Sequence, residues 1–260
     1  MLLDAGSDVN KASNERETAL HYAARYGHTA CIGLLLDCVS VDINARTIWG
    51  LTPLMLAAGS RCGEAGLALV GAGAAVSSRD RSGRSALHHA VKNDMRTLSE
   101  WLLELGADCN AVDSDGNTPL IEALAAGKQA MVALLVRFGC RVREVVGHAT
   151  LSGEYRWCTA FELAVHLGHT HSAHLLYAAG CNFSQFLVPV DQALVAGRLA
   201  PSIADWISRC VGQPRPLVDC VRIAVREALD VRQQEKLSSL PLPPALLSYI
   251  GFTNEREFDE

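Results

Sequence analysis

TPLIEA, the stretch from Thr118 to Ala123, is one of five related segments that decide the fold of this chain. The others are TALHYA, TPLMLA, SALHHA and TAFELA, which begin at Thr18, Thr52, Ser85 and Thr159. The first residues of the five segments are 34, 33, 33 and 41 positions apart. A sequence that resembles itself every ~33 residues is typical of a repeat array, in which each unit buries its apolar face against its neighbours.

Each segment is predicted to open a short helix, and a second apolar helix follows it. Gly27, Gly127 and Gly168 stand nine positions after the opening residue, where a first helix ends in a left-handed residue. The second helices are predicted in CIGLLLD, AGLALVGAG, LSEWLLELG, MVALLVRFG and SAHLLYAAG, and all but the first are closed by glycine. The segments DRSGRS and DSDGNT supply the Asp and Gly that turns between units need.

The Thr or Ser that opens each segment is predicted to cap its helix with a side-chain hydroxyl. His21 and His88, three residues further on, are predicted to hydrogen-bond between neighbouring units and not to act in catalysis. The ~33-residue period with T-P-L-H-x-A resembles the ankyrin repeat. The resemblance covers residues 1–183 and implies an all-α solenoid, built from helix pairs with short inter-repeat fingers.

Three segments depart from the regular repeat. Residues 1–14 match only the second half of a repeat, so we expect a fragment of a longer protein or a short isoform. The 41-residue spacing before Thr159 predicts a longer inter-repeat finger around residues 145–155. Residues 184–212 are predicted to form a degenerate helix pair that caps the array.

Composition narrows the class of protein. The net charge is −5 and no dense Lys/Arg stripe is present, which argues against nucleic-acid binding. No apolar run of ~18 residues and no signal-peptide pattern occurs. The nine cysteines are an odd number and form no C-x-x-C pair, which favours reduced thiols. We therefore expect an intracellular protein of the cytoplasm, with the nucleus as a second location.

A second module is predicted at residues 213–252, followed by a tail at 253–260. Gly212, Pro214 and Pro216 interrupt the helical pattern before it. The stretch PLVDCVRIAVREAL then places an apolar residue at every fourth position, which is one face of a helix. These residues are Leu217, Val221, Val225 and Leu229. Further on, the chain reads LPLPPALLSY from Leu240 to Tyr249, and such an apolar tail after a repeat array indicates a partner-binding surface.

This module resembles the SOCS box, whose first helix inserts into elongin C. The resemblance places Leu217 at the first family position and Val225 at the last. The central position falls on Val221, with Cys220 one residue earlier, so the family cysteine is displaced or replaced by valine. The resemblance also implies that Leu240, Pro241, Leu242 and Pro243 select the cullin-5 scaffold.

Repeats followed by this box resemble the ankyrin repeat and SOCS box proteins. The resemblance implies a non-catalytic substrate receptor of a ubiquitin ligase that contains elongin B, elongin C, cullin-5 and a RING protein. It implies no cofactor, no nucleic acid and no membrane. The alternative is an ankyrin scaffold without ligase coupling, whose tail is only a terminal cap.

The substrate is expected to bind at the finger tips and at the ends of the first helices. The residues predicted for this face are Arg25, Tyr26, Trp49, Arg81, Arg84, Asp115, Tyr155 and Trp157. For Trp49 and Trp157 the alternative is packing against neighbouring fingers. The histidines of HLGHTHSAH, residues 166–174, are spaced closely enough to suggest a metal site, but no cysteine or carboxylate completes a ligand set, so no metal site is predicted.

Overall fold

The computed structural model describes residues 8–142, 145–149 and 155–180. The chain divides into two compact units, Met1–Glu122 and Ala123–Glu260. The boundary falls inside helix α7 (Pro119–Ala125). The predicted capping pair at 184–212 and the module at 213–252 lie outside the described residues.

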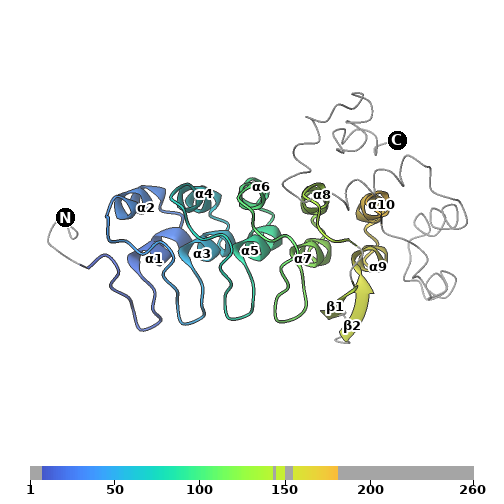
Figure 1. The fold of residues 1–260 in the computed structure, drawn as a ribbon, viewed down its shortest axis with the longest axis horizontal. Coiled ribbons are helices and arrows are strands. Elements are labelled where there is room, and N and C mark those ends of the chain that lie inside the picture. Colours follow the sequence, from blue (N-terminus) through green and yellow to red (C-terminus); the bar gives the residue numbers. More distant parts are fainter. Residues whose placement is uncertain (1–7, 143–144, 150–154, 181–260) are drawn as a thin grey trace, which may run out of the picture. The chain divides into compact units, whose positions relative to one another are not determined.

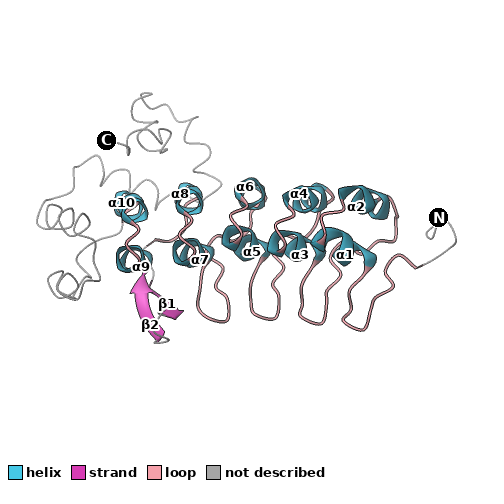
Figure 2. Cartoon of the chain, turned by 180° about the vertical axis from the view of Figure 1, so that it is seen from behind, coloured by secondary structure: helices cyan, strands magenta, loops and turns pink. Residues whose placement is uncertain are grey.

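The first unit is a stack of helix pairs. Figure 1 shows α1, α3 and α5 side by side in one row, with α2, α4 and α6 side by side in a second row. Figure 2 shows the same two rows from behind, with loops extending from the ends of the first row. The helices are α1 (Ala19–Arg25), α2 (Thr29–Leu36), α3 (Pro53–Gly59), α4 (Gly63–Gly71), α5 (Ala86–Lys92) and α6 (Arg96–Glu104).

The core of this unit lies between the two rows. Helices of only seven to nine residues are too short to be stable alone, so they depend on this shared apolar interior. The repeat period places equivalent apolar residues on neighbouring helices of each row. The large side chains that are almost fully buried include Leu20, Ile32, Leu54, Leu69, Leu87, Leu98 and Leu102.

The predicted caps open the first helices. The Thr52 hydroxyl accepts a hydrogen bond from the Met55 N–H at 3.3 Å, and Pro53 occupies the first turn, where its missing N–H costs nothing. Thr118 and Thr159 cap in the same way. At Thr18 and Ser85 the histidine three residues on completes a capping box.

Both buried histidines bridge to the next repeat, which confirms the predicted hydrogen bonds between neighbouring units. His21 Nδ1 accepts from the Thr18 N–H at 3.1 Å, and its Nε2 lies 3.2 Å from the Leu51 carbonyl oxygen. His88 repeats this arrangement with the Asn117 carbonyl at 3.3 Å. Because Nδ1 is the acceptor, the ring proton lies on Nε2 and donates across the repeat boundary.

Left-handed residues end the first helices, as the glycine pattern predicted. Gly27, Gly127 and Gly168 have φ between 67° and 74°. Two repeats lack this glycine, and Arg61 and Asp94 take the same conformation, each with φ of 61°. The fold therefore imposes the left-handed turn even where the side chain disfavours it.

The fingers of the first unit are closed by their own side chains. Asp80 Oδ1 accepts from the N–H groups of Ser82 and Arg84, at 2.8 and 3.0 Å. In the next finger Asp113 Oδ1 accepts two backbone hydrogen bonds in the same way. In the preceding finger the Thr47 hydroxyl accepts two. Each finger also hydrogen-bonds to its neighbour through the backbone. The three bonds run from Ile48 N to Glu15 O, from Arg81 N to Trp49 O and from Ser114 N to Ser82 O, at 2.9, 3.0 and 2.8 Å.

The second unit contains the longer finger that was predicted around residues 145–155. It is an antiparallel hairpin of β1 (Val145–Ala149) and β2 (Tyr155–Thr159), with Val145 opposite Thr159 and Ala149 opposite Tyr155. The unit also contains α8 (Gln129–Arg137), α9 (Ala160–His166) and α10 (Thr170–Ala178), and β2 contacts α9. The all-α class is confirmed, and this hairpin is a local addition to the described helices.

Candidate functional site

The residues predicted for the substrate face differ in how much of their side chains solvent can reach. Tyr26 is 64% exposed at the end of α1, and Trp49 is 60% exposed at a finger tip. This exposure favours a solvent-facing Trp49 over one packed against its neighbours. Tyr22, which the sequence reasoning missed, is 43% exposed one helical turn before Tyr26. Large exposed aromatic side chains are typical anchors of protein interfaces.

The end of α1 carries a group of aromatic and basic side chains, which we call the α1 patch: Tyr22, Arg25, Tyr26 and His28. The Arg25 guanidinium lies 5.9 Å from the centre of the Tyr22 ring, within cation–π range. Tyr26 stacks on His28 with ring centres 6.3 Å apart. Arg25 also forms an ion pair with the buried carboxylate of Glu17. These contacts hold the patch in place before any partner binds, which reduces the entropy lost on binding.

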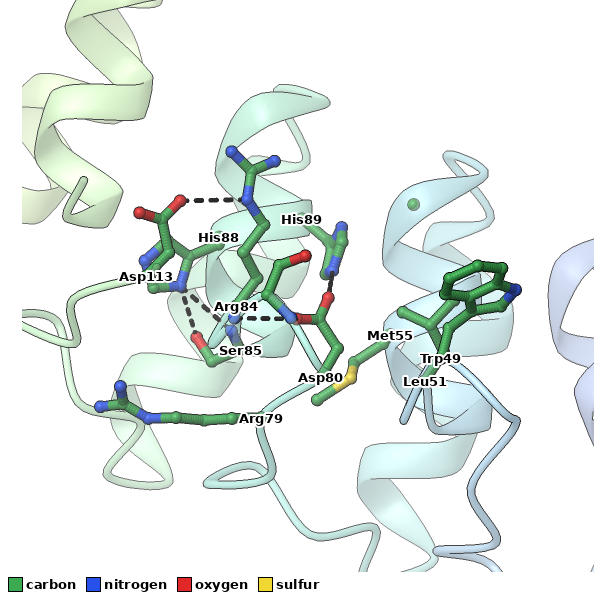
Figure 3. A network of polar contacts seen from close by, with 12 residues as sticks. Trp49, Leu51, Met55, Arg79, Asp80, Arg84, Ser85, His88, His89 and Asp113 are labelled. Atoms are coloured by element: carbon green, nitrogen blue, oxygen red, sulfur yellow. Dashed lines mark hydrogen bonds and ion pairs between the residues drawn. The ribbon is translucent and has the colours of Figure 1, made fainter. Parts of the chain in front are cut away.

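Figure 3 shows a second polar group, centred on Arg84 and Asp80. The Arg84 guanidinium donates to Asp113 Oδ2 at 3.1 Å and to Glu122 Oε1 at 2.5 Å. The Arg84 side chain is only 20% exposed, and the Asp113 side chain is fully buried. The guanidinium is thus engaged within the repeats, and its role here is to hold two carboxylates together across the repeat boundary.

Asp80 binds His89 as well as its own finger. Its Oδ2 lies 3.0 Å from His89 Nε2, so the finger is tied to helix α5 (Figure 3). Burial alone would raise the pKa of Asp80, but the hydrogen bonds from His89 and from the Arg84 and Ser82 backbone lower it below its ordinary value. The carboxylate therefore stays charged and keeps the finger closed at neutral pH.

The remaining predicted residues lie on fingers. Arg81 and Asp115 are exposed at finger tips of the first unit. Tyr155 and Trp157 lie on β2 of the second unit, opposite Ala149 and Gly147. The residues predicted to bind elongin C and cullin lie outside the described residues, and these are Leu217, Cys220, Val221, Val225, Leu240, Pro241, Leu242 and Pro243.

Two kinds of feature are absent from the described part of the chain. No helix there is both long enough and apolar enough to cross a bilayer. No three His, Cys, Asp or Glu side chains of residues 8–142, 145–149 and 155–180 come together as a metal site.

Burial lowers the pKa of His21 and of His88, so both rings are neutral at pH 7 and serve as hydrogen-bonding core groups.

Comparison with known proteins adds the module that lies outside the described residues. The family described as "Ankyrin repeats (3 copies)" matches four overlapping stretches that together run from residue 1 to residue 186. The family described as "SOCS box" matches residues 213–250. The second match includes both the amphipathic stretch after Pro216 and the sequence LPLP.

Known proteins that resemble this chain differ in how much of it they match. Human "Ankyrin repeat and SOCS box protein 16" is 31% identical over 96% of this chain and 55% of its own length. Mouse "B-cell lymphoma 3 protein homolog" is 36% identical over 54% of this chain and 32% of its own length. Human "Rabankyrin-5" is 30% identical over 56% of this chain and 13% of its own length. The chain thus spans about half or less of these relatives.

The similarity to the B-cell lymphoma 3 protein homolog and to Rabankyrin-5 covers only about half of this chain. The similarity to ankyrin repeat and SOCS box protein 16 covers nearly all of it. The helix pairs, the left-handed turns and the cross-repeat histidines agree with the match to ankyrin repeats, which ends at residue 186. The match to the SOCS box begins at residue 213. The chain belongs to the ankyrin repeat and SOCS box family.

Proposed function

We propose that this chain is the substrate-recognition subunit of a ubiquitin ligase built on elongin B, elongin C, cullin-5 and a RING protein. The observation that carries the proposal is the order of two interaction modules, ankyrin repeats followed by a SOCS box. The repeats would hold a target protein, and the box would couple it to the ligase. The chain would act by raising the effective concentration of the target near the ubiquitin-loaded enzyme, without chemistry of its own.

Coupling to elongin C is assigned to the apolar face that begins at Leu217. A helix that inserts into a partner groove places its anchors at every fourth position, and Leu217, Val221 and Val225 have this spacing. Valine at the central position is small and apolar, like the cysteine of the family pattern, so binding is expected to persist. Leu217→Ala combined with Val221→Asn should abolish co-purification of elongin B and C. Undiminished co-purification would refute the assignment.

Coupling to cullin-5 is assigned to LPLP at Leu240–Pro243. Replacing these four residues with alanine should leave elongin B and C bound and remove the cullin. Loss of all three partners would indicate a misfolded box. If elongin and cullin are absent even from wild-type precipitates, the chain is an ankyrin scaffold without ligase coupling.

Target binding is assigned to the α1 patch together with Trp49. Both lie in the first unit, both are exposed, and both combine aromatic surface with a fixed backbone. Tyr26→Ala with Trp49→Ala should remove a subset of bound proteins while elongin is retained, as measured by quantitative mass spectrometry of precipitates. The matched control is Val112→Ser, which trims another exposed apolar residue of the first unit. Equal losses in the control would show that these two aromatics have no special role.

A further inference from the structure

The second-row helices of the first unit carry apolar residues on the side that faces away from the core. In α2 the inward residues Ile32 and Leu35 are buried, yet Leu34 beside them is 65% exposed. In α6 the outward residue Trp101 is 49% exposed, and Leu105 one turn later is 48% exposed. Helix α2 is apolar on both sides, and such a helix normally has partners on both sides. Helix α6 has a mostly polar outward side, on which Trp101 and Leu105 are the apolar exceptions.

The residues at this outward position are in register along the repeats, with Leu34 and Trp101 exposed and Ala68 between them half-buried. Leu34, Ala68 and Trp101 are separated by 34 and 33 residues, the same spacing as the segments that open the repeats. They therefore occupy equivalent positions on α2, α4 and α6, which lie next to one another in Figure 1. We call the row formed by Leu34, Leu67, Ala68, Trp101 and Leu105 the outer strip.

The charges around the outer strip are nearly all negative. Helices α2, α4 and α6 and the residues that end them carry four carboxylates and one guanidinium. These are Asp37, Glu64, Glu100, Glu104 and Arg96. Most of the α2 surface is uncharged, with Ala30, Cys31 and Gly33 exposed next to Leu34. An apolar centre with an acidic border is complementary to an apolar stripe with a basic border.

We propose that the outer strip is a docking surface for a basic amphipathic helix of a partner protein, separate from the substrate face of the first-row helices. Packed helices lie ~8–10 Å apart, so the strip is ~16–20 Å long from Leu34 to Trp101. At 1.5 Å per residue, a helix of about 11–13 residues covers that length. Its leucines would contact Leu34, Ala68 and Trp101, and its lysines would face the carboxylates.

The test uses a fluorescein-labelled peptide of about 14 residues, with leucine at helical spacing and lysine on both flanks. Fluorescence anisotropy measures its binding to the full chain. Two control peptides share its length: one has the same composition in scrambled order, and one has glutamate in place of lysine. The protein variants are Leu34→Ser with Trp101→Gln, and Val112→Ser as the matched control away from the strip.

The expected result is that only the basic amphipathic peptide binds, and that the double variant binds it at least about tenfold more weakly. Val112→Ser should bind as the wild type does, and all three proteins should melt at the same temperature. Raising the salt from ~0.05 to ~0.5 M should weaken binding, because Asp37, Glu64 and Glu104 are exposed.

Several outcomes would overturn the proposal. Binding of the scrambled peptide equal to that of the ordered one would mean attraction by charge alone. Unchanged binding to the double variant would place the peptide elsewhere, and failure of the wild type to bind would exclude the surface. A wild-type dimer in light scattering that Trp101→Gln dissociates would show that a second copy covers the strip. None of these outcomes involves elongin, so the proposed ligase coupling is tested separately.

Discussion

Gly66 and Gly33 lie inside second-row helices, but only one of them has a neighbour where a side chain would go. A Cβ atom at Gly66 in α4 would lie 2.8 Å from Leu98 Cδ2 and 3.1 Å from Leu98 Cδ1. Leu98 is 1% exposed and therefore has little room to move. A Cβ atom at Gly33 in α2 would meet nothing within 4 Å. We predict that alanine stabilises the protein at Gly33 but not at Gly66.

The magnitudes follow from two competing terms. Replacing an interior helix glycine by alanine stabilises a helix by about 1 kcal/mol, because the unfolded chain has less freedom to lose. At Gly33 this term acts alone, so Gly33→Ala should stabilise the protein. At Gly66 the added methyl overfills the core, which costs about 1–3 kcal/mol. Gly66→Ala should therefore range from neutral to about 2 kcal/mol destabilising, and the two variants should differ by about 1–3 kcal/mol.

Thermal unfolding followed by circular dichroism measures this difference. For a domain of this size the melting temperatures of the two variants should differ by roughly 2–12 °C, with Gly66→Ala the lower. Adding Leu98→Val to Gly66→Ala should recover part of the loss, because the shorter side chain makes room for the new methyl. If Gly66→Ala stabilises as much as Gly33→Ala, the close packing of α4 against α6 is wrong.

Three further predictions concern pH, a strained turn and an ion-pair group. Burial lowers the pKa of His21 and His88 below 6.5, so the unfolded chain takes up their protons first. The stability that the two neutral rings contribute is complete above pH 6.5 and falls by up to about 1.4 kcal/mol per pH unit for each ring as the pH drops. Urea titrations at pH 7.5 and 5.5 would measure this loss of stability, and His88→Gln should make the loss smaller. Arg16 has φ of 60°, where the other fingers of the first unit have glycine, so Arg16→Gly should raise stability by about 1 kcal/mol in the same titration. Arg84→Met should lower the unfolding free energy by about 3–5 kcal/mol, because it removes the guanidinium that pairs with two shielded carboxylates. Arg81 is exposed, so Arg81→Met should change the unfolding free energy by less than about 0.5 kcal/mol.

The elements that depend on local spacing could be predicted from the sequence. The opening hydroxyls, the cross-repeat histidines and the closing glycines recur at fixed positions, and each has one physical reason to be there. The left-handed turn at Arg61 could not be found in this way, because arginine does not indicate a positive φ, and at Asp94 the residue type is only a weak indication of one. The hairpin beside α9 was predicted as a longer finger, but its strands have no repeat pattern to compare with.

The candidate site was harder to predict than the fold, because exposure depends on distant neighbours. Arg84 and Arg81 both lie in the same finger, and nothing in the sequence distinguishes their exposure. Only the structure shows that Arg84 meets Asp113 and Glu122, which are 29 and 38 residues further along the chain. Tyr22 was missed because it occupies a helix position where leucine, histidine or glutamate stands in the other repeats, so the residue type there has no consistent pattern.

Rigid fingers give a physical reason for target binding at Trp49. Each finger of the first unit is closed by a hydroxyl or a carboxylate of its own turn, and a backbone hydrogen bond ties it to the next finger. Gly50, beside Trp49, has φ of 75°, and a Cβ atom there would lie 3.2 Å from Arg81 N, so neighbouring fingers approach as closely as a glycine allows. The backbone under Trp49 is therefore already ordered. A partner that contacts this indole need not order the loop, and more of the contact energy remains as affinity.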